Sequence, residues 1–167
     1  MLIGLTGKAG SGKSFAAERL IKMRGFERIK FADPLKDMLR ALGLNEHQIE
    51  GGLKEQPCTL LCGMTPRFAM QTLGTEWGRN TIGPDFWINI FCHRFLSGSI
   101  HRNVVCDDVR FKNEADTIRR LGGYIVHIRT AVESVAHTHA SEIFDLTYDS
   151  EILNDFTPKF GELIDRL

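Results

Sequence analysis

The sequence lacks the features that mark membrane, secreted and nucleic-acid-binding proteins. No apolar run approaches the roughly 20 residues that a membrane helix needs. The apolar start, Met1 to Leu5, leads into a glycine-rich stretch without a basic leader or a cleavage site. Lysine plus arginine equals aspartate plus glutamate at 21 each, which leaves no large positive field for duplex nucleic acid. We therefore expect a cytoplasmic protein that binds neither membranes nor nucleic-acid polymers.

Cysteine and linker-like sequence are also scarce. Of the four cysteines, only Cys58 and Cys62 come near metal-ligand spacing, whereas a zinc site would need two such pairs. Reduced thiols that pack as small hydrophobic side chains are the favoured interpretation. No internal repeat, low-complexity tract or proline-rich linker divides the 167 residues. A single domain over residues 1–167 is therefore expected.

The start of the chain predicts a strand, a helix and a second strand in succession. Residues 2–5 are apolar, helical spacing of apolar residues runs from Ser14 to a stop at Gly25, and residues 26–32 alternate like a strand. This βαβ pattern is typical of an α/β protein with a parallel sheet. Further strands are expected over 103–108 and 124–128 and within 144–153, with helices over 112–121 and from about 157 to 167.

A helical insertion is expected over about 33–100, between core segments 1–32 and 101–167. Its first helix begins at Asp33 and Pro34, with Asp33 as the N-cap and Pro34 as the first helical residue. Other helices begin at Thr65 and near Asp85, and residues 44–64 are expected to be irregular and mobile. The segment from about residue 130 to residue 141 resembles a lid.

The stretch from Gly7 to Ser14 satisfies the pattern G-x-x-x-x-G-K-[ST]. Such glycines let successive backbone N–H groups converge on a phosphate, and the following helix adds its positive N-terminal end. Lys13 can bridge the β- and γ-phosphates, and Ser14 can bind Mg²⁺. The alternative is a chance glycine-rich turn. The candidate nucleotide-binding residues are Gly7, Ala9, Gly10, Ser11, Gly12, Lys13, Ser14 and, later in the chain, Asn154.

Charged residues follow two of the expected strands. Asp107 and Asp108 are the last residues of the strand expected over 103–108, directly after its apolar part. A metal-holding acid of a P-loop protein would lie at this position. Either aspartate could hold the metal. The alternative is that the two are a solvated pair at the strand end, or that one of them caps the next helix. Arg110 and Arg129 lie at strand ends, where ligands of parallel α/β sheets bind. Both are candidate catalytic cations.

The helix from Thr65 carries a second set of candidates. Arg67 and Gln71 share a stripe with the small residues Gly74, Thr75 and Gly78, which suits close approach of a ligand, and Arg79 lies one turn beyond Thr75. For the two arginines, solvated surface charges are an equal alternative. Trp87 could stack on a base, although a core position is the commoner fate of an aromatic residue.

Taken in order, these motifs resemble the deoxynucleoside monophosphate kinases of tailed bacteriophages. The resemblance runs along nearly the whole chain. Its later blocks are more selective than the P-loop alone. It rests on Gly7 to Ser14, Phe31 to Lys36, Lys54-Glu55, Thr65 to Arg67, Gln71 to Glu76, Arg79, Asp108 to Phe111, Asn113-Glu114 and His139 to Glu142.

The resemblance implies a three-layer P-loop NTPase fold with a five-stranded parallel sheet, a helical insertion that binds the nucleoside monophosphate, and a lid. It implies phosphoryl transfer from ATP to a deoxynucleoside monophosphate, with Mg²⁺. The implied lining of the monophosphate site is Arg67, Gln71, Arg79 and Arg110, with Asp33 and Lys36 at its edge.

One departure concerns the lid. Many nucleoside monophosphate kinases carry several lid arginines, whereas residues 130–141 contain none. Catalysis would then depend on Lys13, Arg110 and Arg129, or on a residue from a second subunit of a homodimer. Two alternatives remain open: a kinase of the dephospho-coenzyme A or phosphomevalonate type, and, from a different class, a P-loop switch ATPase. An ATP-consumption assay with and without monophosphates distinguishes a kinase from a switch.

Overall fold

The computed structural model describes residues 1–98, 102–130 and 146–167. They form two compact units. The first, here called the sheet unit, comprises Met1–Lys30 and His93–Leu167, and the second, the helical unit, is Phe31–Cys92. The expected lid, apart from Thr130, lies outside the described residues.

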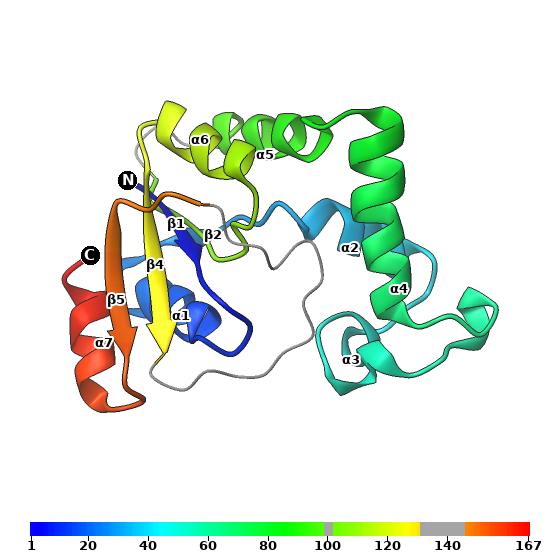
Figure 1. The fold of residues 1–167 in the computed structure, drawn as a ribbon, viewed down its shortest axis with the longest axis horizontal. Helices are drawn as coiled ribbons and strands as arrows, with labels where there is room; N and C mark the ends of the chain where they lie inside the picture. The colour runs from blue at the N-terminus through cyan, green and yellow to red at the C-terminus, as the bar shows by residue number, and fades with distance from the viewer. Residues whose placement is uncertain (99–101, 131–145) are drawn as a thin grey trace. The chain divides into compact units, whose positions relative to one another are not determined.

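A five-stranded sheet forms the sheet unit (Figure 1). Its strand order is β2-β3-β1-β4-β5, and every neighbouring pair is parallel, which confirms the predicted sheet. The carboxyl ends of all five strands therefore lie at one edge. The strands are β1 (Leu2–Thr6), β2 (Glu27–Arg28), β3 (Val104–Cys106), β4 (Tyr124–Thr130) and β5 (Ser150–Asn154).

The second strand is shorter than the alternation over 26–32 predicted. Only Glu27–Arg28 is regular, and one more ladder bond, from Ile29 N–H to the Val105 carbonyl at 3.1 Å, extends it. β2 is an edge strand with a single partner, and the chain turns at Phe31 into the next helix. The alternation of polar and apolar residues therefore extends beyond the residues that form backbone hydrogen bonds with β3. Alternation shows which face of a strand is buried, and it does not show where the hydrogen bonding to the neighbouring strand ends.

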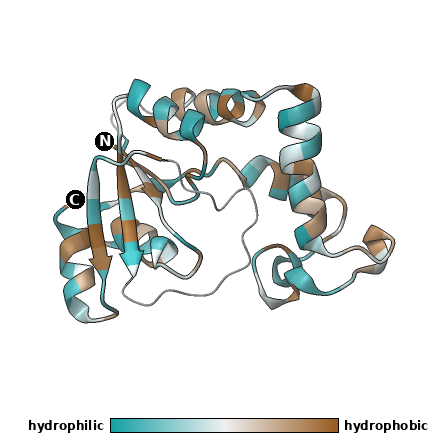
Figure 2. Cartoon of the chain, in the orientation of Figure 1, coloured by the Kyte–Doolittle hydropathy of each residue, from teal (hydrophilic) through white to brown (hydrophobic). Residues whose placement is uncertain are grey.

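Helices cover both faces of this sheet. Alternation places Ile3 and Leu5 on the face covered by α1 (Lys13–Arg24) and α7 (Pro158–Asp165). Gly4 points to the opposite face, where a Cβ atom would lie 2.6 Å from the Ile125 side chain and 2.7 Å from that of Ile118 in α6 (Lys112–Arg120). The three predicted layers are thus present. Hydrophobic residues run along β4 and the middle of β5 (Figure 2).

Short helices make up most of the helical unit. Its core joins Leu39, Leu44 and Ile49 with partly buried side chains of the later helices. The final helix, α5 (Phe86–Leu96), begins in this unit and ends in the sheet unit. The other elements are α2 (Asp33–Ala41), α3 (Glu46–Ile49), the 3₁₀ turns η1 (Gly52–Glu55) and η2 (Thr59–Leu61), α4 (Pro66–Gln71) and the π-helix η3 (Thr72–Ile82).

The expectation of an irregular connection over 44–64 is wrong. Asn45 caps α3, because its side chain accepts the Gln48 N–H at 3.1 Å while the Gln48 side chain accepts the Asn45 N–H at 3.0 Å. This reciprocal capping box stabilises a helix that is only one turn long. The N-x-x-Q pattern was the signal in the sequence that could have revealed it.

Two helix starts can be compared with the prediction. A helix begins at Thr65 and Pro66 as predicted: Pro66 is the first residue of α4, and Thr65 caps it, since its Oγ1 accepts the Phe68 N–H at 3.1 Å. Asp33 is not the N-cap of α2: Ala32 holds that position, and Asp33 is the first helical residue. An acidic residue in the first turn still favours the helix through its dipole, and proline is tolerated there.

Among the described residues, no helix is long and apolar enough to cross a membrane. Cys58 and Cys106 are buried, which fits packing as small hydrophobic side chains.

Candidate active site

The glycine loop joins β1 to α1 with the backbone that a phosphate cradle needs. Gly7 and Gly12 have φ angles of 142° and 99°, which L side chains rarely adopt. A Cβ atom on Gly7 would also collide with the Ile128 carbonyl of β4. Gly12 is the N-cap of α1, so the loop runs directly into a helix N-terminus.

The Lys13 ammonium group lies over this loop. Its Nζ donates hydrogen bonds to the carbonyls of Gly7 and Lys8, both at 2.7 Å. The positive charge therefore lies beside the N–H groups that would surround a phosphate. This arrangement can bind a phosphate chain and stabilise charge on its terminal group.

Asn154 fixes the loop to the end of β5. Its Nδ2 donates to the Ser11 carbonyl at 2.9 Å, its Oδ1 accepts the Phe156 N–H at 2.9 Å, and the residue is only 4% exposed. Both polar ends of this side chain therefore bind backbone. Asn154, a predicted nucleotide-binding residue, contacts the cradle from outside and acts on its shape.

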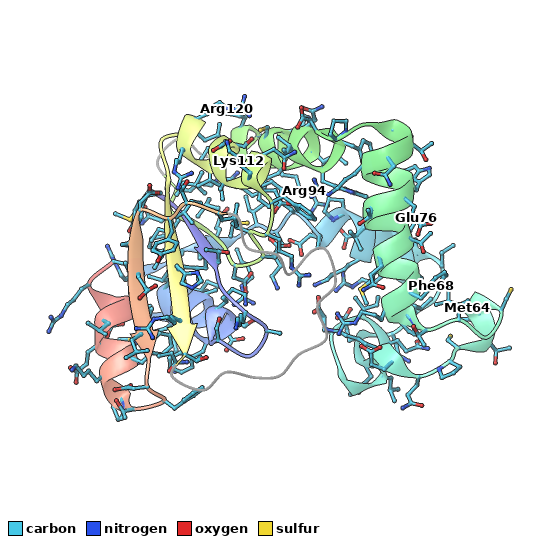
Figure 3. All side chains as sticks on the ribbon, viewed as in Figure 1. Met64, Phe68, Glu76, Arg94, Lys112 and Arg120 are labelled. Atoms are coloured by element: carbon cyan, nitrogen blue, oxygen red, sulfur yellow. The ribbon has the colours of Figure 1, made fainter. Side chains whose placement is uncertain are left out.

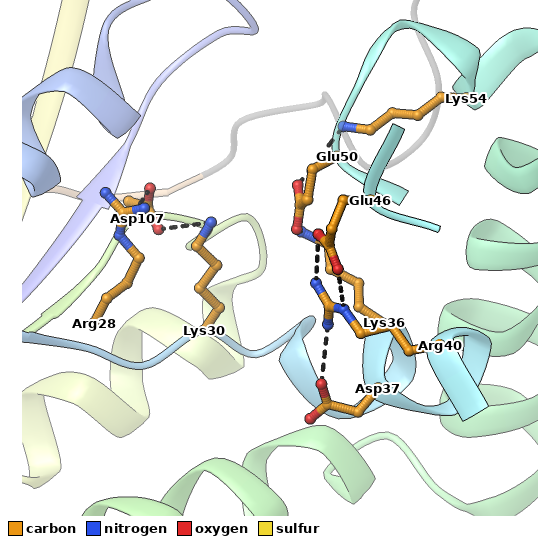
Figure 4. Close-up of polar contacts among 9 residues, drawn as sticks. All are labelled: Arg28, Lys30, Lys36, Asp37, Arg40, Glu46, Glu50, Lys54 and Asp107. Carbon is orange, nitrogen blue, oxygen red and sulfur yellow. Dashed lines mark hydrogen bonds and ion pairs between the residues drawn. The ribbon is translucent and has the colours of Figure 1, made fainter. Parts of the chain in front are cut away.

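The two aspartates after β3 have different surroundings. Asp107 is 4% exposed, and its carboxylate lies 3.5 Å from Lys30 Nζ and 3.8 Å from Arg28 Nε (Figure 4). Asp108 is partly exposed and accepts a hydrogen bond from the Cys106 thiol at 3.2 Å. Burial, and then the charge of Asp108, raises the pKa of that thiol. Sequence reasoning found the aspartates but not the two cations.

Arg110 lies on a loop that a buried carboxylate shapes. Glu114, 2% exposed, accepts the backbone N–H groups of Arg110 at 2.8 Å and of Phe111 at 3.1 Å. These bonds fix the turn between β3 and α6 and leave the Arg110 side chain exposed. The sequence analysis gave Glu114 no role, although an acid three residues into a helix is a known capping signal.

Arg129 is the penultimate residue of β4 and is paired with the neighbouring strand. Its Nε lies 3.0 Å from Glu151 Oε1 on β5, and the Tyr148 hydroxyl donates to the other oxygen of Glu151 at 3.1 Å. The hydrogen bond from Arg129 is the main cause that lowers the pKa of Glu151. The Arg129 side chain is 53% exposed, so this predicted catalytic cation is accessible to a ligand.

In the helical unit, two of the predicted acceptor-binding cations are paired with carboxylates. Arg67 Nε lies 2.7 Å from Glu55, and Lys36 Nζ lies 2.6 Å from Glu50 (Figure 4). Arg79 donates to the Pro84 carbonyl at 3.4 Å. Asp33 begins α2 and Gln71 ends α4, both partly buried.

Packing accounts for part of the small-residue stripe. The helix changes to π-helical bonding at Thr72, so α-helical spacing fails beyond Gln71. Phe68 of α4 is 50% exposed and points outward (Figure 3). Trp87 occupies the space beside Gly78, where its ring would collide with a Cβ atom. It is 2% exposed, and it donates to the Gly74 carbonyl at 2.8 Å. The buried Trp87 ring offers no exposed face for a base.

A glycine loop leading from β1 into α1, with its lysine folded over it at the edge of a parallel sheet, defines a P-loop phosphotransferase. The family model for deoxynucleotide monophosphate kinases matches residues 62–155, more than half of the chain. A protein of Acanthamoeba polyphaga mimivirus, provisionally named a deoxynucleotide monophosphate kinase, is 40% identical over 174 aligned positions, covering 94% of this chain and 90% of that protein. The chain belongs to the deoxynucleotide monophosphate kinase family, and it is a nucleotide monophosphate kinase.

Solved structures give weaker likenesses. The APS kinase of Mycobacterium tuberculosis aligns with a TM-score of 0.46 and 16% identity over 98% of this chain and 94% of that one. A sugar kinase from Janibacter aligns with a TM-score of 0.44 and 16% identity over 99% of this chain and 90% of that one. The assignment does not depend on either.

Proposed function

We propose that the chain transfers the γ-phosphoryl group of ATP to a deoxynucleoside monophosphate, giving ADP and the deoxynucleoside diphosphate, with the site residues described below. The observation that carries the proposal is the folded glycine loop with Lys13 over it, in a chain of this family. The donor's phosphates bind the loop N–H groups between Gly7 and Ser14. Asn154 keeps the loop in shape through the Ser11 carbonyl.

The residues present fit a magnesium ion. Asp107 is buried, and its Oδ1 accepts no hydrogen bond within the described part of the chain. Mg²⁺ prefers oxygen ligands and typically takes one or two carboxylates together with waters and substrate phosphates. Ser14 and Asp107 would hold it, and the contact of Arg28 with both residues favours Asp107 over Asp108. When bound, the ion would neutralise charge that develops on the phosphates.

The acceptor's phosphate binds residues of the helical unit. Arg67 and Arg79 contact it as charge-assisted donors, with Gln71, Lys36 and Asp33 around them. The pairing of Arg67 with Glu55 and of Lys36 with Glu50 supports this role, because each cation is held by an anion that a phosphate can replace. Trp87 is not included, since it is buried.

The chemical step needs cations rather than a base. An oxygen of the acceptor phosphate, already an anion, bonds to the γ-phosphorus while the bond from γ-phosphorus to the bridging oxygen breaks and ADP takes the electron pair. Lys13, Arg110 and Arg129 stabilise the charge that gathers between the two phosphates. Glu114 positions Arg110 through the backbone.

The proposal is tested by measuring ADP formation with a panel of acceptors. We expect turnover only when a deoxynucleoside monophosphate is present, and near-background ATP consumption without an acceptor. The panel includes all ribonucleoside monophosphates, dephospho-coenzyme A and phosphomevalonate. Turnover on either of the last two, or ATP hydrolysis that ignores the acceptor, would contradict the proposed reaction.

Two finer points rest on the sequence alone. The motif set supports an origin in a tailed bacteriophage, which the genes neighbouring the coding sequence would test. The absence of arginine from residues 130–141 supports a homodimer that contributes a cation across its interface. Sedimentation at several protein concentrations tests this second point, and a monomer with full activity would contradict it.

A further inference from the structure

Two cations that the mechanism has not used face the Asp107 carboxylate. β2 and β3 are neighbours, with Arg28 in register with Val105. Because side chains alternate along strands, Arg28, Lys30, Val105 and Asp107 point to one face. That face is covered by α1, since Val105 packs in the core formed with its alanines and Leu20.

The three charged groups form a mostly buried cluster in the sheet unit. The exposed fractions of the side chains are 2% for Asp107, 16% for Lys30 and 25% for Arg28. The separations of 3.5 Å and 3.8 Å are those of charge pairs, and among the described residues neither Asp107 Oδ1 nor Arg28 Nε has a hydrogen-bond partner. The charges of Lys30 and Arg28 therefore compensate the negative charge of the Asp107 carboxylate. Its Oδ1 still has lone pairs with which it can bind a ligand.

Arg28 also contacts the loop helix. Its Nη2 donates to the Ser14 carbonyl at 3.2 Å. One guanidinium group therefore touches Asp107 and Ser14, the two residues assigned to the metal above. Lys30 approaches the same carboxylate from two residues further along the chain (Figure 4).

We propose that Arg28 and Lys30 are positioning residues that hold Asp107 ready for a divalent cation and prevent it from binding one without a nucleotide. This inference rests on the proposed metal site. Two positive charges and one negative charge give these three mostly buried groups a net charge of +1. A further carboxylate, that of Glu18, lies 3.9 Å from Arg28 Nη2, but it is 70% exposed and is screened by solvent. A bare divalent cation meets repulsion from both basic groups at short range, in a partly buried place where solvent screens poorly. A triphosphate brings enough negative charge to offset this repulsion, so Asp107 binds the cation only as part of a metal–nucleotide complex.

The test measures binding of Mn²⁺, used as a spectroscopic probe in place of Mg²⁺, to the protein without nucleotide. Electron paramagnetic resonance of unbound Mn²⁺ gives the affinity. We compare the wild type with Lys30→Met, which removes one charge, and with the matched control Lys30→Arg, which keeps it. Arg28→Gln is a second charge-removing variant that can still donate to the Ser14 carbonyl.

We expect Lys30→Met and Arg28→Gln to bind Mn²⁺ about tenfold or more tightly than the wild type, while Lys30→Arg does not change the affinity. Adding Asp107→Asn to either charge-removing variant should abolish this increase in Mn²⁺ affinity. Wild-type affinity in both charge-removing variants would overturn the inference, as would an equal gain in Lys30→Arg. Circular dichroism identifies a variant that fails to fold, and the other charge-removing variant then decides.

The proposed metal site itself is tested separately. Asp107→Asn alone should weaken binding of Mn²⁺–ADP to the protein. If it does not, the assignment of Asp107 to the metal fails. If it does, and the charge-removing variants still bind bare Mn²⁺ like the wild type, only the inference about Arg28 and Lys30 fails.

Discussion

The two units hold their candidate site residues in different ways. In the sheet unit, buried side chains bind backbone: Asn154 donates to the Ser11 carbonyl, and Glu114 accepts the Arg110 N–H. In the helical unit, exposed side chains bind each other, as in the pair of Arg67 and Glu55, which are 44% and 64% exposed. The loops of the proposed donor site are therefore held by buried hydrogen bonds, whereas Arg67 of the proposed acceptor site is held by a contact that a ligand can exchange. The exposed pair of Arg129 and Glu151 is an exception within the sheet unit.

The energies involved agree with this difference. A hydrogen bond to a charged group contributes about 1.5–3 kcal/mol, and leaving a buried partner unsatisfied costs a similar amount. An exposed ion pair contributes only about 0–1 kcal/mol. Replacing Glu55 by a phosphate that carries more charge should therefore cost little.

The largest effect is expected at the proposed donor site. Lys13→Ala should lower kcat by about 10² or more, because the proposed role of its ammonium group is to stabilise charge on the transferred phosphoryl group. Lys22→Ala, which removes an exposed lysine from the last turn of the same helix, is the control and should retain activity. Steady-state kinetics provide the measurement, and near-normal turnover in Lys13→Ala would mean that the loop does not bind the nucleotide.

The exchangeable contacts predict opposite effects for the two members of a pair. Arg67→Ala should raise KM for the deoxynucleoside monophosphate by about 10- to 100-fold, the loss of one charge-assisted contact. Glu55→Gln should lower the same KM by about two- to fivefold, because it releases Arg67 from an exposed ion pair. Arg67→Lys should recover little, since an ammonium group lacks the forked geometry.

The measurement varies each substrate in turn. KM for ATP should stay nearly constant in all three variants. If KM for ATP rises as much as KM for the acceptor, the assignment of the two substrates to different units is wrong. An increase of the acceptor KM in Glu55→Gln would mean that Glu55 supports Arg67 rather than competing for it.

Trp87 is an exception to the difference between the two units, because it lies in the helical unit and yet is a buried side chain that binds backbone. Trp87→Phe should destabilise the protein by about 1–3 kcal/mol, since the Gly74 carbonyl loses its donor and a cavity forms. Urea unfolding measures this change. Trp77→Phe is the matched control, because Trp77 is 36% exposed. Equal stability of the two variants would contradict the role of Trp87 in the core.

The smallest effect concerns an ion pair at the surface of the sheet unit. Arg19 binds Asp165 through two hydrogen bonds, at 2.7 and 2.6 Å, and this bonding lowers the pKa of Asp165 below its ordinary value of 3.8. A lowered folded-state pKa contributes stability above the unfolded pKa, and that stability is lost as pH falls through the folded one. The melting temperature of Asp165→Asn should therefore lie slightly below that of the wild type at neutral pH and converge with it under acid conditions below pH 3.8.

Glu162→Gln is the comparison for this prediction, since Glu162 is an exposed acid on the same helix that acts on Arg19 through its charge. The difference between its melting temperature and that of the wild type should change less with pH than the difference for Asp165→Asn does. A difference between Asp165→Asn and the wild type that persists in acid would mean that the carboxylate acts through packing rather than through charge.

Local, contiguous signals were sufficient for much of the fold. The run from Gly7 to Ser14 lies within one strand–loop–helix unit, so the sequence alone determined the cradle and, with it, the parallel sheet. The cap at Thr65 is also a contact between residues three apart. The Asn45 capping box was equally local and was overlooked rather than hidden.

Only the tertiary structure decided how distant residues combine. Asp107 and Lys30 are brought together by the adjacency of β2 and β3, and Asn154 reaches Ser11 because β5 ends beside the loop. Trp87 packs against Gly78 and donates to the Gly74 carbonyl, 13 residues earlier in the chain. Side-chain spacing reports a residue's own face of a helix or strand. It carries no information about which other element packs there, since that depends on strand order and on burial summed over the whole core.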